Sequence, residues 1–387
     1  MTLEHLGIAS ADAAATLATL ERLFGLRAYK SETVEREGVR THFVDTGARL
    51  ELLEALSPAS PVARFLEKRG EGVHHLAFRV ADVDAAVVRL KDAGVALLAD
   101  APKPGADGKR IVFLHPRATP GLLVELLSDD PDALPEPDWA DTPAGRLAAY
   151  RFGRAADDAR PSILVLHGAA GSTRLETLLL ARLLEPHGHV VALDLPGHGR
   201  SGGDGAVTFE STMEAVVGAM DALGLDRPHV VGYSFGGAVA LVLAAEHPER
   251  VARLAVHATN LTWDDATVAG MTRRLRADAM ERRYPDLWAR FEAAHEGRTR
   301  DVFDRVAAFS GTIPAFAPRA ADLLARVAAP TLVTAGDADE LFSLDRTLAL
   351  RRALPSASLG ILPGVRHALT PEAARTLAPM IAAHLAA

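Results

Sequence analysis

A single serine stands between two glycines where it could act as a nucleophile. The segment Val230–Leu241 starts with a β-branched pair, passes through Gly232-Tyr233-Ser234-Phe235-Gly236 and ends in an Ala/Val/Leu-rich run. A buried strand, a Gly-x-Ser-x-Gly turn and a helix make a nucleophile elbow, in which a strained turn exposes the serine hydroxyl above a sheet. Glycines are needed beside the turn because larger residues would clash with the strand or the helix. The segment therefore predicts nucleophilic catalysis at Ser234.

Four other polar residues, His5, Glu51, His75 and Glu125, each stand in a short apolar run that resembles a strand. An ionised glutamate buried in such a run is costly unless it is paired or binds a metal. Two imidazoles and two carboxylates suit one divalent first-row metal with open coordination positions. The same alternation also arises when four polar residues lie on a solvated strand face. From the pattern alone, both interpretations stay open.

These four residues occupy equivalent places in an internal repeat. The run His5-Leu6-Gly7-Ile8-Ala9 parallels His75-Leu76-Ala77-Phe78-Arg79, and each is followed by an amphipathic segment, near 11–23 and 83–93, that ends at a glycine. Each half closes with an apolar strand that carries one glutamate. The repeat predicts a unit of one strand, one helix and further strands that is used twice.

The elements that position Ser234 alternate between strand and helix. Apolar strands are expected at 147–152, 163–166 and 190–193, and a helix at 209–223 precedes the strand of the serine. This alternation predicts a parallel sheet whose functional loops lie at the carboxyl ends of the strands. The glycine-rich loops that follow 163–166 and 190–193 lack the spacing of a phosphate-binding or dinucleotide-binding loop.

The whole chain sets further bounds. Its 387 residues exceed one ordinary core, and the acidic, proline-rich run 128–138 is typical of a linker, so we expect domains at 1–128 and 143–387 joined by 129–142. The formal charge of −8 argues against nucleic-acid partners and membrane-surface binding, and the absence of cysteine excludes disulfides, thiolate zinc sites and cysteine nucleophiles. We find no signal peptide and no apolar run long enough to span a bilayer, and we expect a cytoplasmic protein.

The first domain resembles methylmalonyl-CoA epimerase, of the vicinal-oxygen-chelate (glyoxalase) superfamily. The likeness runs through residues 3–128. Its motifs are Glu4-His5-Leu6-Gly7-Ile8-Ala9, Leu50-Glu51-Leu52-Leu53-Glu54, Ser60–Leu66, Gly72-Val73-His74-His75-Leu76-Ala77-Phe78, Gly108–Pro116 and Leu123-Val124-Glu125-Leu126. The resemblance implies an α+β fold in which two βαβββ modules curl around a metal.

The resemblance also implies roles for the four polar residues. The family's metal ligands fall on His5, Glu51, His75 and Glu125, and the expected ion is Co, Mn, Zn or Ni. In the family the metal stabilises a thioester enolate while carboxylates move the α-proton, so Glu125 is expected to be both ligand and base. Some members place a second glutamate where this chain has Thr41, which counts against full epimerase activity. His74 is expected to point to the other face of its strand and to be structural.

Residues 146–387 resemble a serine α/β-hydrolase. The motifs are His167-Gly168, Asp194-Leu195-Pro196-Gly197-His198-Gly199-Arg200-Ser201, Gly232–Gly237, Pro330–Asp339 and Gly364-Val365-Arg366-His367. The resemblance implies Ser234 as nucleophile, Asp339 as the acid that orients the histidine, and His367 as general base, with Asp337 as the second candidate for the acid. The backbone N–H groups of Ala169 and Phe235 are the expected oxyanion hole.

A helical cap is expected at about 260–325. Amphipathic segments at 271–283, 287–295 and 300–309 predict its helices. The aromatic residues of this region suit an acyl pocket or, as we favour, packing within the cap; they are Trp263, Tyr284, Trp288 and Phe291. The arginine runs 273–276 and 282–283 are typical of a solvated face, with an anionic substrate such as a CoA phosphate as the alternative.

These observations favour a serine hydrolase of an ester or thioester, with an acyl-CoA preferred, fused to a metal-dependent epimerase-like domain. A homodimer formed through the N-terminal domain is also considered. Three alternatives stay open: a glyoxalase-type lyase joined to a glutathione-thioester hydrolase, a ring-cleavage dioxygenase joined to a C–C hydrolase, and a hydrolase whose first domain only binds or dimerises. Fold-level analogy does not fix the substrate of either domain.

Overall fold

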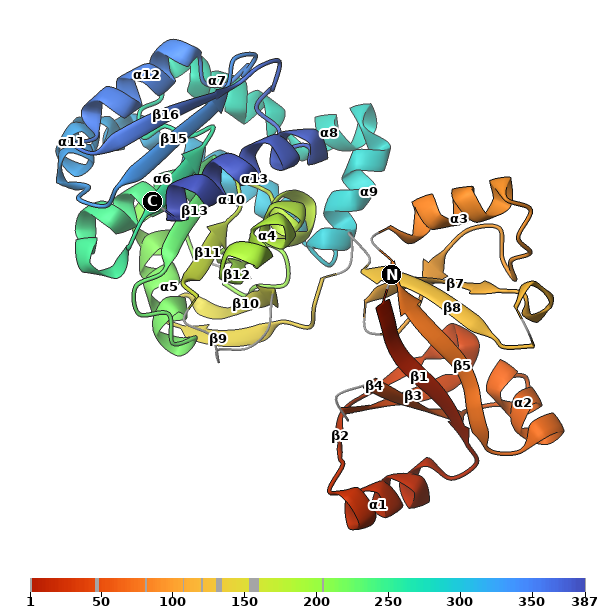
Figure 1. Ribbon diagram of the computed structural model, residues 1–387. Helices are drawn as coiled ribbons and strands as arrows, with labels where there is room; N and C mark the ends of the chain where they lie inside the picture. Colours follow the sequence, from red (N-terminus) through yellow and green to blue (C-terminus); the bar gives the residue numbers. More distant parts are fainter. Residues whose placement is uncertain are drawn as a thin grey trace. The chain divides into compact units, whose positions relative to one another are not determined.

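The chain divides into two compact units, Met1–Ala133 and Leu134–Ala387. The computed structural model describes residues 2–45, 49–80, 82–106, 108–119, 121–129, 134–152, 160–203 and 205–386. Figure 1 shows the elements of each unit.

The first unit contains two modules of one strand, one helix and three strands. The first module is β1 (Thr2–Ser10), α1 (Ala13–Phe24), β2 (Ala28–Val34), β3 (Val39–Asp45) and β4 (Arg49–Ala55). The second is β5 (Gly72–Arg79), α3 (Val83–Asp92), β6 (Lys103–Pro104), β7 (Lys109–Leu114) and β8 (Val124–Asp129). The expected βαβββ repeat is therefore confirmed. An additional helix, α2 (Pro61–Arg69), joins the modules and was not anticipated.

All strands of this unit form one eight-stranded sheet in the order β2-β3-β4-β1-β5-β8-β7-β6. The first strands of the two modules, β1 and β5, pair with each other in antiparallel fashion at its centre. The repeat thus brings equivalent residues of the two modules onto neighbouring strands (Figure 1).

The second unit alternates strands and helices. Its strands are β9 (Asp138–Thr142), β10 (Gly145–Phe152), β11 (Ser162–Leu166), β12 (His189–Leu193), β13 (His229–Tyr233), β14 (Leu254–His257), β15 (Thr331–Gly336) and β16 (Ala357–Leu362). Its α-helices are α4 (Leu178–Leu184), α5 (Phe209–Ala222), α6 (Phe235–Glu246), α7 (Asp265–Arg274), α8 (Ala277–Arg283), α9 (Pro285–Ala294), α10 (Thr299–Ser310), α11 (Ile313–Arg326), α12 (Leu344–Ala353) and α13 (Pro371–Ala386).

The sheet order is β16-β15-β14-β13-β11-β12-β10-β9, parallel from β16 to β12 and antiparallel at β10 and β9. Alternation along the strands separates two apolar cores: Leu147 and Ala149 of β10 pack with α5 and α6, whereas Ala148 and Tyr150 pack with α4 and α13. Helices therefore cover both faces of a mostly parallel sheet, which confirms the predicted class. None of the helices in the described ranges is long and apolar enough to cross a membrane.

Two expectations need correction. Part of the expected linker, residues 138–142, is strand β9: Ala140 is fully buried and pairs with Leu147, so this segment belongs to the second sheet. Residues 130–133 of that linker lie outside the described part of the chain. The single cap helix expected at 271–283 is two helices, α7 and α8, because Arg276 adopts an extended conformation between them.

Candidate functional site

Ser234 lies in a sharp turn between β13 and α6. Its φ of 50° and ψ of −114° place it in a conformation that L-residues rarely adopt. The turn needs its flanking glycines: a Cβ at Gly232 would lie 2.5 Å from the carbonyl oxygen of Gly236, and one at Gly236 would lie 2.4 Å from that of His167. The geometry is that of a nucleophile elbow, which holds the Ser234 side chain at the end of β13.

The structure brings Ser234, His367 and Asp339 together in a chain of hydrogen bonds. Ser234 Oγ lies 3.0 Å from His367 Nε2, and His367 Nδ1 lies 2.9 Å from Asp339 Oδ2. The other oxygen of Asp339 accepts the backbone N–H groups of Leu341 and Phe342 at 2.8 and 2.9 Å. Asp337, the second candidate for the acid, instead accepts the N–H of Gly364 at 2.6 Å and is exposed.

The surroundings of Asp339 keep it ionised. Burial alone would raise the pKa of its carboxyl group, but the hydrogen bond and charge of His367, with the backbone N–H donors, hold that pKa below its usual range. An ionised aspartate at Nδ1 orients the imidazole so that Nε2 faces the serine. The arrangement can therefore remove a proton from Ser234 and stabilise the imidazolium that results.

A second loop lies next to the serine, and it carries Ala169. Gly236 of the elbow packs against the carbonyl of His167, so the loop that follows β11 approaches the start of α6 closely. Phe235 is the first residue of α6, and its N–H has no partner within the helix. The N–H of Gly168 is already taken by Glu176 Oε2 at 2.7 Å. Ala169 and Phe235 stay our predicted oxyanion donors.

Two residues that were not anticipated hold this loop. Glu176 is partly buried, and desolvation raises its pKa to about 8 despite the bond from Gly168. His295, which directly follows α9 of the cap, is fully buried; its Nε2 lies 3.0 Å from the carbonyl oxygen of Ala170, and its Nδ1 accepts the N–H of Gly199 at 2.9 Å. Burial lowers the pKa of His295 to about 4, so it stays neutral and fixes one ring orientation.

The cap aromatics lie mainly in packing positions. Trp288 and Phe291 contact Phe303 edge to face, and Trp263 packs against Phe342, whose ring in turn contacts His367. Tyr284 is different because it is 46 % exposed. Of the four, Trp263 is therefore the one linked through a single ring to His367.

In the first unit, strand register explains how the four repeat residues meet. Gly7 of β1 pairs with Glu51 on one side and with His75 on the other. His5, two residues earlier on β1, pairs with Ala77, which in turn pairs with Glu125. The four side chains therefore come from two neighbouring sets of paired residues. The small residues Gly7 and Ala77 leave space between them; a Cβ at Gly7 would lie 2.2 Å from the His75 ring.

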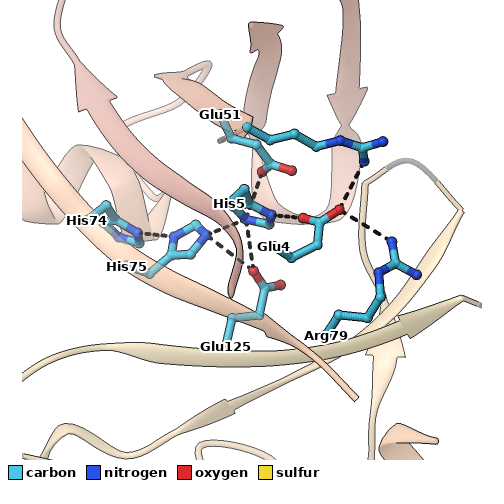
Figure 2. Close-up of polar contacts among 8 residues, drawn as sticks. Glu4, His5, Glu51, His74, His75, Arg79 and Glu125 are labelled. Carbon is cyan, nitrogen blue, oxygen red and sulfur yellow. Dashed lines mark hydrogen bonds and ion pairs between the residues drawn. The ribbon is translucent and has the colours of Figure 1, made fainter. Parts of the chain in front are cut away.

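Three of these residues form a compact set of ligand atoms. His5, His75 and Glu125 are buried, and one atom from each lies within 4.8 Å of the others. Their closest approaches are 3.0 Å between the two Nε2 atoms, and 3.3 and 3.2 Å from these to Glu125 Oε2. Glu51 lies outside that set, but its carboxylate is 3.4 Å from His5 Nε2 (Figure 2). The donor set and spacing fit one divalent cation.

A further carboxylate, Glu4, orients His5. It contacts His5 Nδ1 and also binds Arg49 and Arg79 at 2.9 and 3.3 Å (Figure 2). Burial alone would raise the pKa of Glu4, but the hydrogen bond and charge of His5, with the two arginines, lower it to about 2. A carboxylate on the far nitrogen of a histidine is the usual way in which a protein aims the other nitrogen at a metal.

His74 does not point away from the site, contrary to expectation. Gly7 of β1 pairs with His75, but the next residue, Ile8, pairs with Val73, so His74 is an extra residue in a β-bulge. The bulge turns both side chains to one side, where their Nδ1 atoms are 3.1 Å apart (Figure 2). Strict alternation had predicted opposite faces.

The cluster opens into a cavity of about 240 Å³ in the first unit. Its polar walls include three carboxylates, Glu37, Glu51 and Glu125, and one lysine, Lys103, which lies 2.5 Å from Glu37. Thr41 is buried and also lines the cavity. The position at which the sequence resemblance suggested a second glutamate is thus filled by a hydroxyl group.

Two family models match the chain, one in each unit. Residues 4–113 match the model of the glyoxalase/bleomycin resistance protein/dioxygenase superfamily, and residues 161–374 match that of the alpha/beta hydrolase fold.

Individual relatives repeat this division. The chain is 39% identical over 127 residues to the ethylmalonyl-CoA/methylmalonyl-CoA epimerase of Cereibacter sphaeroides, covering 32% of this chain and 95% of that protein. It is 30% identical over 220 residues to the 2-hydroxymuconate semialdehyde hydrolase of Pseudomonas putida, covering 51% of this chain and 76% of the relative. The solved enol-lactonase of Burkholderia xenovorans LB400 has a similar fold, with a TM-score of 0.54 and 21% sequence identity. The match covers 65% of this chain and 100% of the enol-lactonase chain.

Proposed function

The chain belongs to the alpha/beta hydrolase fold family and carries a first unit of the glyoxalase superfamily homologous to methylmalonyl-CoA epimerase, and on this premise we propose that it is a serine esterase or thioesterase. The observation that supports this most directly is the unbroken contact from Ser234 Oγ through His367 to Asp339. All three groups needed to activate a serine are present at hydrogen-bonding distance.

The proposed reaction proceeds through an acyl-serine. His367 takes the proton of Ser234 as the hydroxyl attacks the substrate carbonyl, and then gives that proton to the departing alcohol or thiol. The N–H groups of Ala169 and Phe235 stabilise the negative charge on the carbonyl oxygen. Water then attacks the acyl-serine with His367 again acting as base, which releases the acid and restores Ser234.

We favour an acyl-CoA thioester as the substrate. The first unit is homologous to proteins named for CoA thioesters, and its fusion to the hydrolase suggests related substrates. The P. putida relative, named for 2-hydroxymuconate semialdehyde, supports C–C hydrolysis as the alternative. The same triad can serve either reaction, so the substrate has to be tested rather than argued from the fold.

The test compares Ser234→Ala with wild type on activated p-nitrophenyl esters, a panel of acyl-CoA thioesters and 2-hydroxymuconate semialdehyde. We expect kcat to fall by roughly a thousandfold or more on whichever substrate is turned over. Ser358→Ala, which changes an exposed serine on strand β16, is the matched control and should keep full activity. Wild-type rates in the Ser234 variant would refute the proposal.

We also propose that the first unit removes and returns the proton α to a thioester carbonyl with the help of a divalent cation. His5, His75 and Glu125, with Glu51 beside His5, would hold Co, Mn, Zn or Ni. The cation, when bound, supplies positive charge that stabilises negative charge on the thioester oxygen. Glu125 is the proposed base; it is buried, and its carboxylate lies 3.3 and 3.2 Å from the Nε2 atoms of His5 and His75.

Because Thr41 replaces a second base, we expect proton exchange to be faster than inversion. Racemic methylmalonyl-CoA incubated in D₂O should gain deuterium at C2, and a single enantiomer should exchange before it racemises. Thr41→Glu should raise the rate of inversion relative to exchange, and Glu125→Gln should abolish both. Bound metal, measured by inductively coupled plasma mass spectrometry, should be lost in His75→Ala. Metal-free wild type, or exchange that survives Glu125→Gln, would refute this proposal.

A further inference from the structure

The cap contains a broad groove rich in arginine, beside the loops that carry Asp339 and His367. The groove has a volume of about 960 Å³ and is lined by residues of α7, α8, α9 and two loops. Its charged lining consists of Arg273, Arg274, Arg283, Arg366, Asp264 and Glu340. Four guanidinium groups against two carboxylates make this a positive surface in a chain whose formal charge is −8. The groove is large enough for a ligand of nucleotide size.

Two of the four arginines have no carboxylate partner among the residues that the structure describes. Glu340 lies 3.7 Å from Arg274 and 3.4 Å from Arg366, so it partly neutralises that pair. In the ranges that the structure describes, no carboxylate lies at ion-pair distance from Arg273 or Arg283; the guanidinium of Arg283 stacks over the ring of Tyr284 instead. Unpaired guanidinium groups in a concave surface favour an anion with several oxygens, because each guanidinium can bind two oxygens.

The groove shares two loops with the catalytic triad. Glu340 and Leu341 follow Asp339, and Arg366 precedes His367. Glu340 also accepts the backbone N–H of His367 at 3.1 Å. An anion bound in the groove therefore contacts the loops that position the acid and the base. This arrangement suits a substrate whose reactive carbonyl lies at Ser234 and whose charged group lies at a distance from that carbonyl.

We infer that this groove binds the phosphorylated tail of the leaving group of a thioester substrate, as in a CoA thioester. The inference rests on the proposed serine hydrolase and names the part of its substrate that the cap recognises. Tyr284 and Leu287, exposed at 46 % and 37 %, line the same groove and offer apolar contact to a base or a pantetheine arm. Phosphates bind the arginines, and the acyl group extends toward the serine.

The kinetic test compares one acyl group on CoA and on N-acetylcysteamine, a neutral leaving group without phosphates. Wild type should prefer the CoA thioester in kcat/KM, and added salt should weaken that preference. Arg273→Glu combined with Arg283→Glu should lower the preference by at least roughly tenfold, equivalent to about 1.4 kcal/mol. Arg276→Glu combined with Arg282→Glu changes the net charge equally at exposed positions outside the groove lining, and should leave the preference unchanged.

A binding test separates this inference from the proposed hydrolysis. Free CoA and adenosine 3′,5′-bisphosphate are titrated calorimetrically into the Ser234→Ala protein with and without each arginine pair changed. Weaker binding in the Arg273/Arg283 variant alone supports the groove even if no thioester is hydrolysed. Equal binding in both double variants, or a wild type without preference for the CoA thioester, overturns the inference while leaving a Ser234 hydrolase of another substrate possible.

Discussion

Asp337 and Asp339 are two residues apart, yet their carboxylates serve different partners. Asp339 binds His367 and two backbone N–H groups, whereas Asp337 accepts one N–H from Gly364. We predict that Asp339→Asn lowers kcat by roughly a hundredfold to ten-thousandfold, because the amide favours the wrong histidine tautomer. Asp337→Asn keeps an acceptor for Gly364 and should change kcat by less than about threefold. Steady-state kinetics on the active ester or thioester decide; similar losses in both variants would contradict the assignment.

A second prediction at the residue scale concerns Glu176 and the pH dependence of the stability of the fold. Its pKa is about 8 in the folded chain, above its ordinary value of 4.5, so the folded state holds the proton more tightly than the unfolded state. Its stabilising contribution is therefore complete below about pH 4.5 and is lost as the pH rises through 8. Glu176→Gln keeps an acceptor for Gly168 without titrating.

The thermal midpoint of wild type should accordingly fall relative to that of Glu176→Gln between pH 5 and pH 9. Each pKa unit corresponds to about 1.4 kcal/mol, so the total change should reach a few kcal/mol. Unfolding scans at several pH values measure it. Parallel curves for the two proteins would show that Glu176 is ionised in the folded state.

At the residue scale, the motif residues could be predicted from the sequence, but the residues that hold the loops around them could not. Ser234, Asp339 and His367 stand in recognisable local patterns, and the structure places them at bonding distance. His295 has no local signal, because its partners Ala170 and Gly199 lie far away in the chain. Such contacts depend on tertiary packing, which no short pattern encodes.

At the scale of elements, the central pairing of β1 with β5 makes the cluster of the first unit. Gly7 stands opposite His75, where any side chain would meet the imidazole ring. We predict that Gly7→Ala displaces His75 and lowers bound metal at least roughly tenfold, since one of the proposed ligands loses its position. Ile8→Ala, on the neighbouring position of the same strand, should retain the metal. Metal content and circular dichroism of both variants measure this; full occupancy in Gly7→Ala would contradict it.

The elements themselves could be predicted where periodicity was strong and missed where it was weak. The repeat, the hydrolase strands and α5 follow clear apolar patterns. Strand β9 has one fully buried residue, Ala140, within an acidic segment, so its composition resembled a linker. The break between α7 and α8 has no glycine or proline, and the bulge at His74 arises from pairing with β1. In each case the decisive contact comes from another part of the chain.

At the scale of the whole molecule, each proposed site is built from one unit alone. The metal cluster draws on residues between Thr2 and Asp129, and the triad on residues between β13 and α13. We predict that removing metal with a chelator abolishes proton exchange and leaves ester or thioester hydrolysis within about twofold of its original rate. Ser234→Ala should show the reverse. Parallel assays on one preparation, with metal added back, measure it; hydrolysis that falls with the metal would show that the sites depend on each other.

The assembly of the molecule is also open to measurement. The homodimer through the first unit that the sequence analysis considers should appear in light scattering as twice the chain mass of 41.0 kDa. A monomer at working concentration would contradict the dimer without affecting either proposed site.

The measurement that tests the central claim most directly is mass spectrometry of the protein after reaction with a fluorophosphonate ester. The account predicts one phosphonyl adduct, on the peptide that contains Ser234, formed in parallel with the loss of hydrolysis. Labelling of wild type should be slower when substrate is present, because the hydroxyl is then blocked. Labelling of His367→Ala should also be slower, because its serine hydroxyl is not activated. Complete inactivation with the adduct elsewhere, or full activity with Ser234 labelled, would contradict the claim that Ser234 is the nucleophile.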